Sequence, residues 1–141
     1  MPITITDVDQ GRGNLIRGEG QIHGEEYVRV MRQHLTKPAS QFKKYRYSLF
    51  ELTAVSAVDV PAKDVHVVAR LCRDAAHVNP DAVVAIVVGE NDLAFGLSRM
   101  WQLSLGDAAW EVQVFRDTDD ALAWITDRAA EKFGLTELTF A

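Results

Sequence analysis

The side chains that could do chemistry are spread along one predicted helix rather than gathered into a catalytic or metal-binding cluster. His66, Arg70, Arg73 and His77 follow one another at i, i+4, i+7 and i+11, a spacing that places them on one side of a helix. This basic ridge could hold an anion or an acidic partner, and a solvated helix face is the alternative. The two histidines cannot share a metal ion, because a rise of about 1.5 Å per residue places them roughly 16 Å apart.

Three carboxylates, Asp117, Asp119 and Asp120, crowd the start of the last predicted helix. Paired carboxylates can act as general acid and base, and three can bind a divalent cation. Capping and a favourable interaction with the helix dipole explain them with fewer assumptions. We therefore interpret this cluster as a helix start rather than a site.

The remaining polar motifs also favour structural roles. His34 lies on the apolar side of a predicted helix, where we expect it to be half-buried and hydrogen-bonded. The glycines of segment 18–24 approach the dinucleotide-binding fingerprint, but the third glycine comes one position late, so we expect turn and cap glycines. We predict no catalytic residues, no metal site, no cofactor and no enzymatic activity.

One aromatic side chain departs from the periodicity of its helix. Segment 93–105 predicts a helix whose inward stripe contains Leu93, Leu97, Met100 and Trp101. Phe95 leaves this stripe, which indicates a pocket wall or an interface unless the ring folds over its own helix entry. Trp124 flanks the apolar stripe of the last helix in a similar way. The candidate ligand or interface residues are therefore Phe95, Arg99, Met100, Trp101 and Trp124.

Alternating strands and helices must position these residues. Ile3 and Ile5 alternate with threonines and predict a strand, which a turn at 10–13 joins to a second strand at 14–22 as an antiparallel hairpin. The further predicted elements are a helix at 25–35, a break at 37–40, a strand at 45–52, a helix from 59–61 to 79–80, a strand at 83–88, the helix at 93–105, a strand at 112–117 and a helix around 121–125. Apolar strands without alternation indicate burial on both faces. The sequence thus predicts one α/β domain over residues 1–141, with a mostly parallel sheet, an antiparallel N-terminal strand and helices packed on it.

The composition excludes several classes of protein. The chain has 141 residues, which suits a single domain, and its net charge of -5 argues against a general nucleic-acid binder. The lone Cys72 excludes an intramolecular disulfide and zinc sites built on paired cysteines. The longest apolar run, at 83–88, is too short to span a bilayer, and the N-terminus lacks a signal-peptide pattern. We therefore expect a cytoplasmic protein without an integral membrane segment.

The two ends of the predicted domain differ in character. Residues 1–13 form the first strand and turn, whereas residues 134–141 form a tail that is apolar for a terminus. Gly134 is expected to stop the last helix. The apolar side chains of the tail, Leu135, Leu138 and Phe140, need a partner surface in the same subunit or in another one. A homodimer is therefore one of the expectations.

Several segments resemble a known family. Residues 51–59, ELTAVSAVD, resemble the strand-to-loop signature of the STAS domains, the anti-sigma-factor antagonists. Segments 85–87 (AIV), 95–100 (FGLSRM) and 114–125 (VFRDTDDALAWI) are similar to hallmarks of a sister family, the SpoIIAA-like bacterial proteins. The resemblance covers residues 14–125 and implies a compact domain of four βα turns. Distant relatives with similar topology bind lipids in apolar pockets, which is an analogy of fold alone.

One departure from the family pattern bears on function. In the antagonists a phosphorylatable Ser or Thr follows the loop aspartate at a helix N-terminus, whereas the corresponding positions here are Val60 and Pro61. We therefore expect no phosphorylation switch. The leading hypothesis is a non-enzymatic protein that binds a small apolar or lipid-like ligand in a pocket beneath the last two helices. The alternative is a protein-interaction module that acts through the same helices or by self-association.

Overall fold

A five-stranded mixed sheet forms the centre of the molecule. The computed structural model describes residues 2–106 and 110–140. The strands lie side by side in the order β1 (Ile3–Val8), β2 (Gly13–His23), β3 (Tyr47–Asp59), β4 (Val83–Val87) and β5 (Glu111–Phe115). The short 3-10 helix η1 (Asp9–Gly11) joins the antiparallel pair β1 and β2, whereas β2 to β5 pair in parallel. The predicted α/β class, the mostly parallel sheet and the N-terminal hairpin are therefore confirmed.

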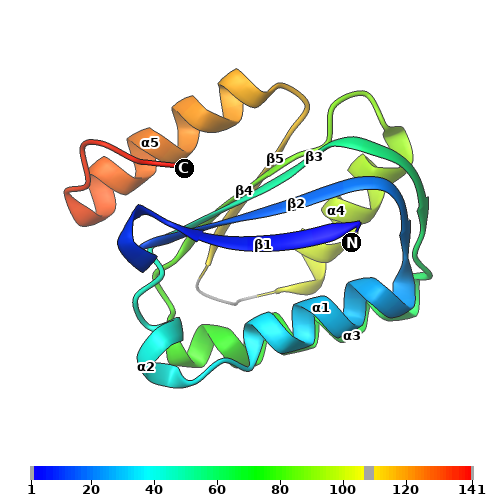
Figure 1. Ribbon diagram of the computed structural model, residues 1–141, viewed down its shortest axis with the longest axis horizontal. Helices are drawn as coiled ribbons and strands as arrows, with labels where there is room; N and C mark the ends of the chain where they lie inside the picture. Colours follow the sequence, from blue (N-terminus) through cyan, green and yellow to red (C-terminus); the bar gives the residue numbers. More distant parts are fainter. Residues whose placement is uncertain (1, 107–109, 141) are drawn as a thin grey trace.

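Helices cover the two faces of this sheet unequally (Figure 1). The helices α1 (Gly24–Leu35), α3 (Ala62–Val78) and α4 (Asp92–Ser104) connect successive parallel strands and lie on one face. The helix α5 (Thr118–Phe133) follows the last strand and lies on the opposite face. A short helix α2 (Ala39–Phe42) occupies the segment that the sequence predicts as a break.

Burial along the strands follows from this arrangement. Val83, Ala85 and Val87 of β4 are each 0% exposed and face α5, while Val84 and Ile86 face the other helices and are 3% exposed. The prediction of a strand buried on both faces is thus confirmed for β4. It is wrong for β5, whose side chains are half-buried or exposed because β5 is an edge strand.

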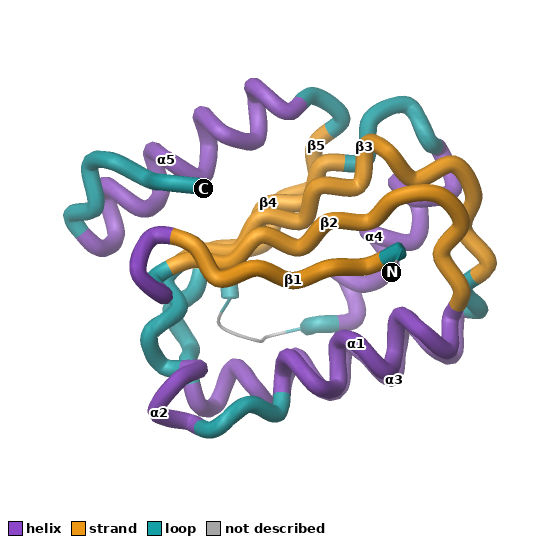
Figure 2. Tube along the Cα trace, viewed as in Figure 1, coloured by secondary structure: helices purple, strands orange, loops and turns teal. Residues whose placement is uncertain are grey.

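The strands β2 and β3 extend well beyond the rest of the sheet. β3 pairs with β4 as far as Glu51, whereas its pairing with β2 continues to Asp59, opposite His23. Two register shifts bend the pair, the second at Gly20, whose φ of 67° suits glycine. Figure 2 shows this two-stranded extension, here called the ribbon, curling towards the beginnings of α1 and α3. The predicted strand over 45–52 therefore ended too early.

Local capping sets the ends of the later helices. Asn91 Oδ1 accepts a hydrogen bond from the backbone N–H of Ala94 (2.9 Å) at the start of α4. Asp117 Oδ1 accepts from the N–H of Asp119 (2.7 Å) at the start of α5, so the interpretation of these carboxylates as a helix start is confirmed. Gly134, with a φ of 70°, ends α5 as predicted.

The C-terminal tail completes the core on the α5 side of the sheet. Leu135, Leu138 and Phe140 are half-buried against this core, and the Phe140 ring lies 5.5 Å from the ring of Tyr47. The tail therefore finds its partner surface within its own subunit. The outermost residues of the predicted end segments, 1 and 141, lie outside the described residues.

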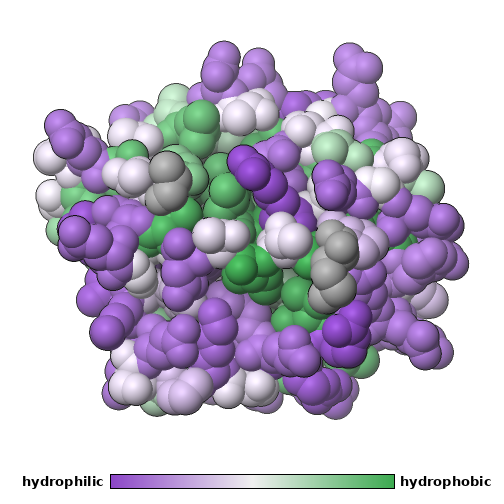
Figure 3. Space-filling model, viewed as in Figure 1, coloured by the Kyte–Doolittle hydropathy of each residue, from purple (hydrophilic) through white to green (hydrophobic). Residues whose placement is uncertain are grey.

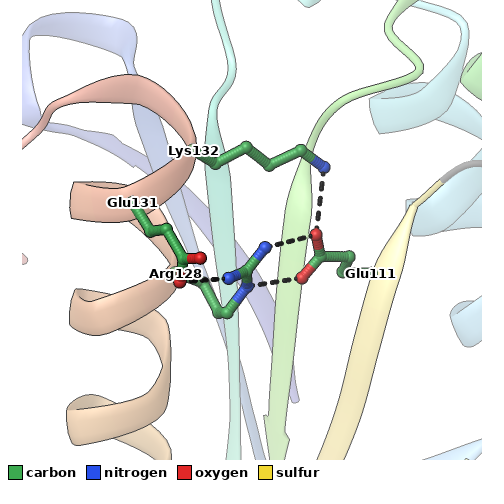
Figure 4. A network of polar contacts seen from close by, with 4 residues as sticks. All are labelled: Glu111, Arg128, Glu131 and Lys132. Atoms are coloured by element: carbon green, nitrogen blue, oxygen red, sulfur yellow. Dashed lines mark hydrogen bonds and ion pairs between the residues drawn. The ribbon is translucent and has the colours of Figure 1, made fainter.

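An ion network ties α5 to the edge strand β5 (Figure 4). Arg128 donates two hydrogen bonds to the carboxylate of Glu111, at 2.7 and 2.8 Å, and one to Glu131 at 2.6 Å. Lys132 Nζ lies 3.3 Å from the same Glu111 carboxylate. The hydrogen bonds from Arg128 hold the pKa of Glu111 below its ordinary value.

Among the described residues, no helix combines the length and the apolar character needed to cross a lipid bilayer.

Candidate functional site

An apolar cavity of about 100 Å³ lies between the sheet and the helices α1, α3 and α4. Apart from the hydroxyls of Tyr27 and Ser98 and the indole N–H of Trp101, the side chains that line it are apolar. Burial raises the pKa of the Tyr27 phenol, so this group stays neutral. The cavity therefore suits apolar groups and offers little to a charged molecule.

The ribbon supplies the outer wall of this cavity. Leu52, Val55 and Val58 of β3 line it together with Ile22 of β2, and Val60 extends the wall into the link to α3. The wall thus lies beyond the point where β4 ends, at the carboxyl ends of the parallel strands. Open α/β sheets commonly bind ligands at that end.

A second, smaller cavity of about 20 Å³ adjoins the first one, and we call it the polar chamber. Both cavities share the wall residues Ile16, Met31, Phe50 and Trp101. The polar chamber lies towards the amino ends of β2 and β3, where Asn14 contributes to its wall. These four residues therefore form the wall that the two spaces have in common.

The polar chamber contains buried polar atoms without partners. Asn14 Nδ2, Asn14 Oδ1, His34 Nδ1 and Trp101 Nε1 have no hydrogen-bond partner among the described residues, and all three residues line the chamber. Asn14 is 1% exposed and His34 is 5% exposed. The expectation of a half-buried, hydrogen-bonded His34 is therefore wrong on both points. Each such group costs about 1–3 kcal/mol when it is left unpaired.

The titratable groups of the chamber are neutral at pH 7. Burial lowers the pKa of His34 to about 4, with a further lowering from Lys37 and an opposing effect from Asp7. Burial raises the pKa of the Cys72 thiol to about 12, although the nearby Trp101 indole acts in the other direction without reaching hydrogen-bonding geometry. The described walls of the cavity and of the chamber contain no Asp, Glu, Lys or Arg. The side chains that line the space are therefore uncharged, and the nearest charged pair, Lys37 and Asp7, is bound to the outer side of the wall through the Tyr45 hydroxyl, at 3.0 and 2.6 Å.

Phe95, the leading aromatic candidate from the sequence, is not in the described cavity wall. Its ring is half-buried, and the guanidinium of Arg116 stacks over it at 4.3 Å. Arg116 also donates to the carbonyl of Gly89 (3.2 Å) and pairs with Asp92 (2.8 Å). Phe95 thus forms part of a cluster at the entry of α4, which matches the structural alternative in the sequence analysis. The inward position predicted for Leu93 is wrong, since this side chain is 56% exposed.

The other aromatic candidates are separated by the sheet. Trp101 is 5% exposed and lines both the cavity and the chamber. Met100 packs half-buried against the same core, while Arg99 is exposed and donates to the Gln102 side chain (2.8 Å). Trp124 belongs to α5 and packs on the opposite face. A shared pocket beneath α4 and α5 is therefore not formed.

The basic ridge lies exposed on α3, as the helical spacing predicts. His66 Nδ1 is 3.0 Å from the Ser104 hydroxyl, and Arg73 donates to the Ser104 carbonyl. His66 and Arg73 therefore both contact Ser104, the last residue of α4. Arg70 and His77 lie exposed on the same helix, α3. Within residues 2–106 and 110–140, no group of three or more His, Cys, Asp or Glu side chains is arranged to hold a metal ion.

Comparison with known proteins adds no family assignment to this geometry. The chain matches no protein-family model, and no curated protein matches it significantly.

Proposed function

We propose that this protein binds a small apolar ligand, without catalysing a reaction on it, in the apolar cavity between the sheet and α1, α3 and α4. The observation that supports this function most is the apolar wall of a space of about 100 Å³ between the sheet and its helices. Space of this kind forfeits dispersion contacts that a ligand would restore. An engineered apolar cavity of about 150 Å³ binds benzene, so the volume suits a ligand of that class.

The resemblance to the SpoIIAA-like proteins supports the same proposal by analogy of fold. Val60 lines the cavity and Pro61 precedes α3, so the position that carries a hydroxyl in the antagonists belongs here to the cavity wall and the helix start. This placement favours ligand binding over a phosphorylation switch. A lipid-like ligand would have to extend beyond the cavity, with one end of its chain inside.

Titration with toluene, followed by protein NMR, tests the proposal. Ala94 is 5% exposed and lines the cavity, so Ala94→Leu should fill part of the space. We expect saturable binding to the unaltered protein and binding at least about tenfold weaker to Ala94→Leu, because ligand and leucine compete for one volume. The perturbed resonances should include those of Val55 and Val65, which face the cavity from β3 and α3.

Phe95, which follows Ala94 in the sequence, provides the matched control. Phe95→Ala alters the α4 entry cluster rather than the cavity, so toluene affinity should stay within about twofold of the unaltered protein. Absence of saturable binding, or equal affinity of the protein and Ala94→Leu, would contradict the proposed function.

A second candidate function is self-association through α4, and one observation favours it. Leu103 is 72% exposed and Leu93 is 56% exposed, although both are large apolar side chains on the same helix. Sedimentation of the protein and of Leu103→Glu tests this candidate. A dimer that dissociates in the variant would support it, and a monomer at all accessible concentrations would exclude it.

A further inference from the structure

Resting on the proposed apolar-ligand function, we propose that the ligand is a small amphiphile. Its apolar body fills the cavity, and a single neutral, hydroxyl-like group reaches the polar chamber and hydrogen-bonds to Asn14. This assigns a polarity and an orientation to the ligand that the apolar cavity by itself does not give.

The unpartnered atoms define the group that would bind. Asn14 offers one donor, Nδ2–H, and one acceptor, Oδ1, and both are buried without partners among the described residues. A hydroxyl can donate and accept at once, so it complements such a pair better than a group with a single function. His34 and Trp101 line the same small space, and their unpartnered Nδ1 and Nε1 atoms are further candidate partners. Most buried polar atoms pair within the protein or with ordered water, so unpaired atoms of this kind call for a partner from outside the chain.

The absence of charge selects a neutral group. Among the described residues that line the two spaces, none is an Asp, Glu, Lys or Arg, and His34 is neutral at pH 7. A carboxylate or an ammonium group would lose its hydration without gaining a counter-ion, which is strongly unfavourable. A hydroxyl loses much less, and Asn14 replaces the lost hydrogen bonds.

Trp101 and Met31 lie where the apolar cavity and the polar chamber adjoin. Both side chains belong to the wall of the cavity and to the wall of the polar chamber. Met31 is 2% exposed, and its unbranched, flexible side chain can change rotamer at little cost. Of the side chains that the two walls share, Met31 is therefore the one best able to move aside for a ligand that reaches from the cavity to Asn14.

Paired titrations with toluene and p-cresol test the proposal, because the two molecules differ by one hydroxyl. We expect p-cresol to bind at least about fivefold more tightly than toluene at pH 7. In a cavity without partners for the hydroxyl, p-cresol would instead bind roughly five- to a hundredfold more weakly. The comparison uses the unaltered protein, so it decides the question even if a variant fails to fold.

Asn14→Leu then identifies the partner. Leucine keeps the branched shape of asparagine, fills the polar chamber more fully and lacks both unpartnered atoms, so the variant should keep its toluene affinity and reverse the preference between the two probes. Ser98→Ala is the control, because it removes a hydroxyl from the cavity wall outside the polar chamber, and it should keep the preference for p-cresol.

The outcomes separate this inference from the proposed function. If neither probe binds, the proposed function itself fails, and this inference fails with it. If toluene binds and p-cresol binds more weakly, the proposed apolar-ligand function stands, and the inference that the ligand is an amphiphile is wrong. Tighter binding of benzoate than of p-cresol would also overturn the inference, since the site would then prefer an anion.

Discussion

The two faces of the sheet differ in how completely they are filled. On the α5 face, Tyr47, Ala121 and Ile125 are 0% exposed, and the Tyr47 hydroxyl donates to Asp9 (2.8 Å). On the face covered by α1, α3 and α4, the apolar cavity and the polar chamber lie side by side. All the unpartnered buried side-chain atoms found among the described residues belong to that second face. One face is thus filled, while the other contains the space and the unpartnered atoms to which we assign a ligand in our proposals.

The surface view does not mark either face by itself. In Figure 3, apolar surface forms several separate patches, with hydrophilic side chains between and around them. The ribbon of β2 and β3 curls away from the rest of the sheet (Figure 2) and encloses the cavity together with α1, α3 and α4.

The largest difference in stability between the two faces should come from truncating one isoleucine on each of them. Ile125 is 0% exposed in the α5 core, so Ile125→Ala should lower the free energy of unfolding by about 3–5 kcal/mol. Ile22 is 7% exposed and borders the cavity, where it has fewer neighbours to lose, so Ile22→Ala should cost about 2 kcal/mol. Urea titrations of both variants measure the difference. Equal losses would mean that the two faces are equally well packed.

The pH dependence of stability should report on the polar chamber. The pKa of His34 falls from 6.5 to about 4 in the folded protein, so the unfolded chain binds more protons between these values. The free energy of unfolding should therefore fall as the pH drops from about 6.5 to 4, by up to about 3 kcal/mol in total. Urea titrations across this range should show a shallower slope for His34→Gln, in which the titrating group is removed. An unchanged slope in that variant would assign the pH dependence to other groups.

Replacing a buried alanine by leucine should destabilise the filled face but not the face that contains the cavity. Ala121 is 0% exposed near the start of α5, and Ala94 is 5% exposed near the start of α4, where it lines the cavity. Ala121→Leu should destabilise by about 1–3 kcal/mol through overpacking. Ala94→Leu should be neutral or stabilise by up to about 1 kcal/mol, because it fills existing space. Thermal unfolding of the pair checks this, and a large loss in Ala94→Leu would show that the cavity is too small or misplaced.

Much of the architecture could be predicted from the sequence, because periodicity and capping are local signals. The unbroken apolar run at 83–88 predicted β4, and Asp117 and Gly134 predicted the ends of α5. Periodicity was less reliable in α4, where Leu93 shares the spacing of the buried residues but lies in the exposed first turn. The ribbon was missed because its exposed alanines, serine and threonine within 53–57 weaken the strand signal.

The candidate site could be predicted only in part, because a cavity is a property of packing between distant segments. Trp101 was recognised from the apolar stripe of its helix. Ile22 and Val55, which line the cavity with it, lie in the ribbon, and no pattern in the sequence marks them as cavity residues. Asn14 offered a usable signal, as a polar residue directly before the apolar Leu15 in a predicted strand, and it was passed over. Trp124 was grouped with Trp101 because a sequence does not say which face of a sheet each helix covers.

The smallest expected effect concerns how α5 is held on the filled face. α5 is the only helix of the described segments on that face, and its bidentate pair between Arg128 and Glu111 supplements apolar packing (Figure 4). Arg128→Lys keeps the charge but removes the paired geometry, and it should lower the free energy of unfolding only slightly, since the pair is partly exposed to solvent. The loss should shrink in high salt, and it should also shrink once the pH falls below the lowered pKa of Glu111 in the folded protein, where Glu111 is protonated in both the folded and the unfolded state.

Arg116→Lys is the matched comparison for that substitution. Arg116 follows the end of β5, whereas Glu111 begins this strand. Arg116 pairs with Asp92, but the two side chains are 44% and 90% exposed. Its ion pair should contribute almost nothing, so any loss in this variant would come from the stacking on Phe95, which is less sensitive to salt. Urea titrations of both variants at low and high salt separate the two cases. If Arg128→Lys is as insensitive to salt as Arg116→Lys, the network does not hold α5, and apolar burial of Ala121, Ile125 and Ala129 suffices to dock the helix.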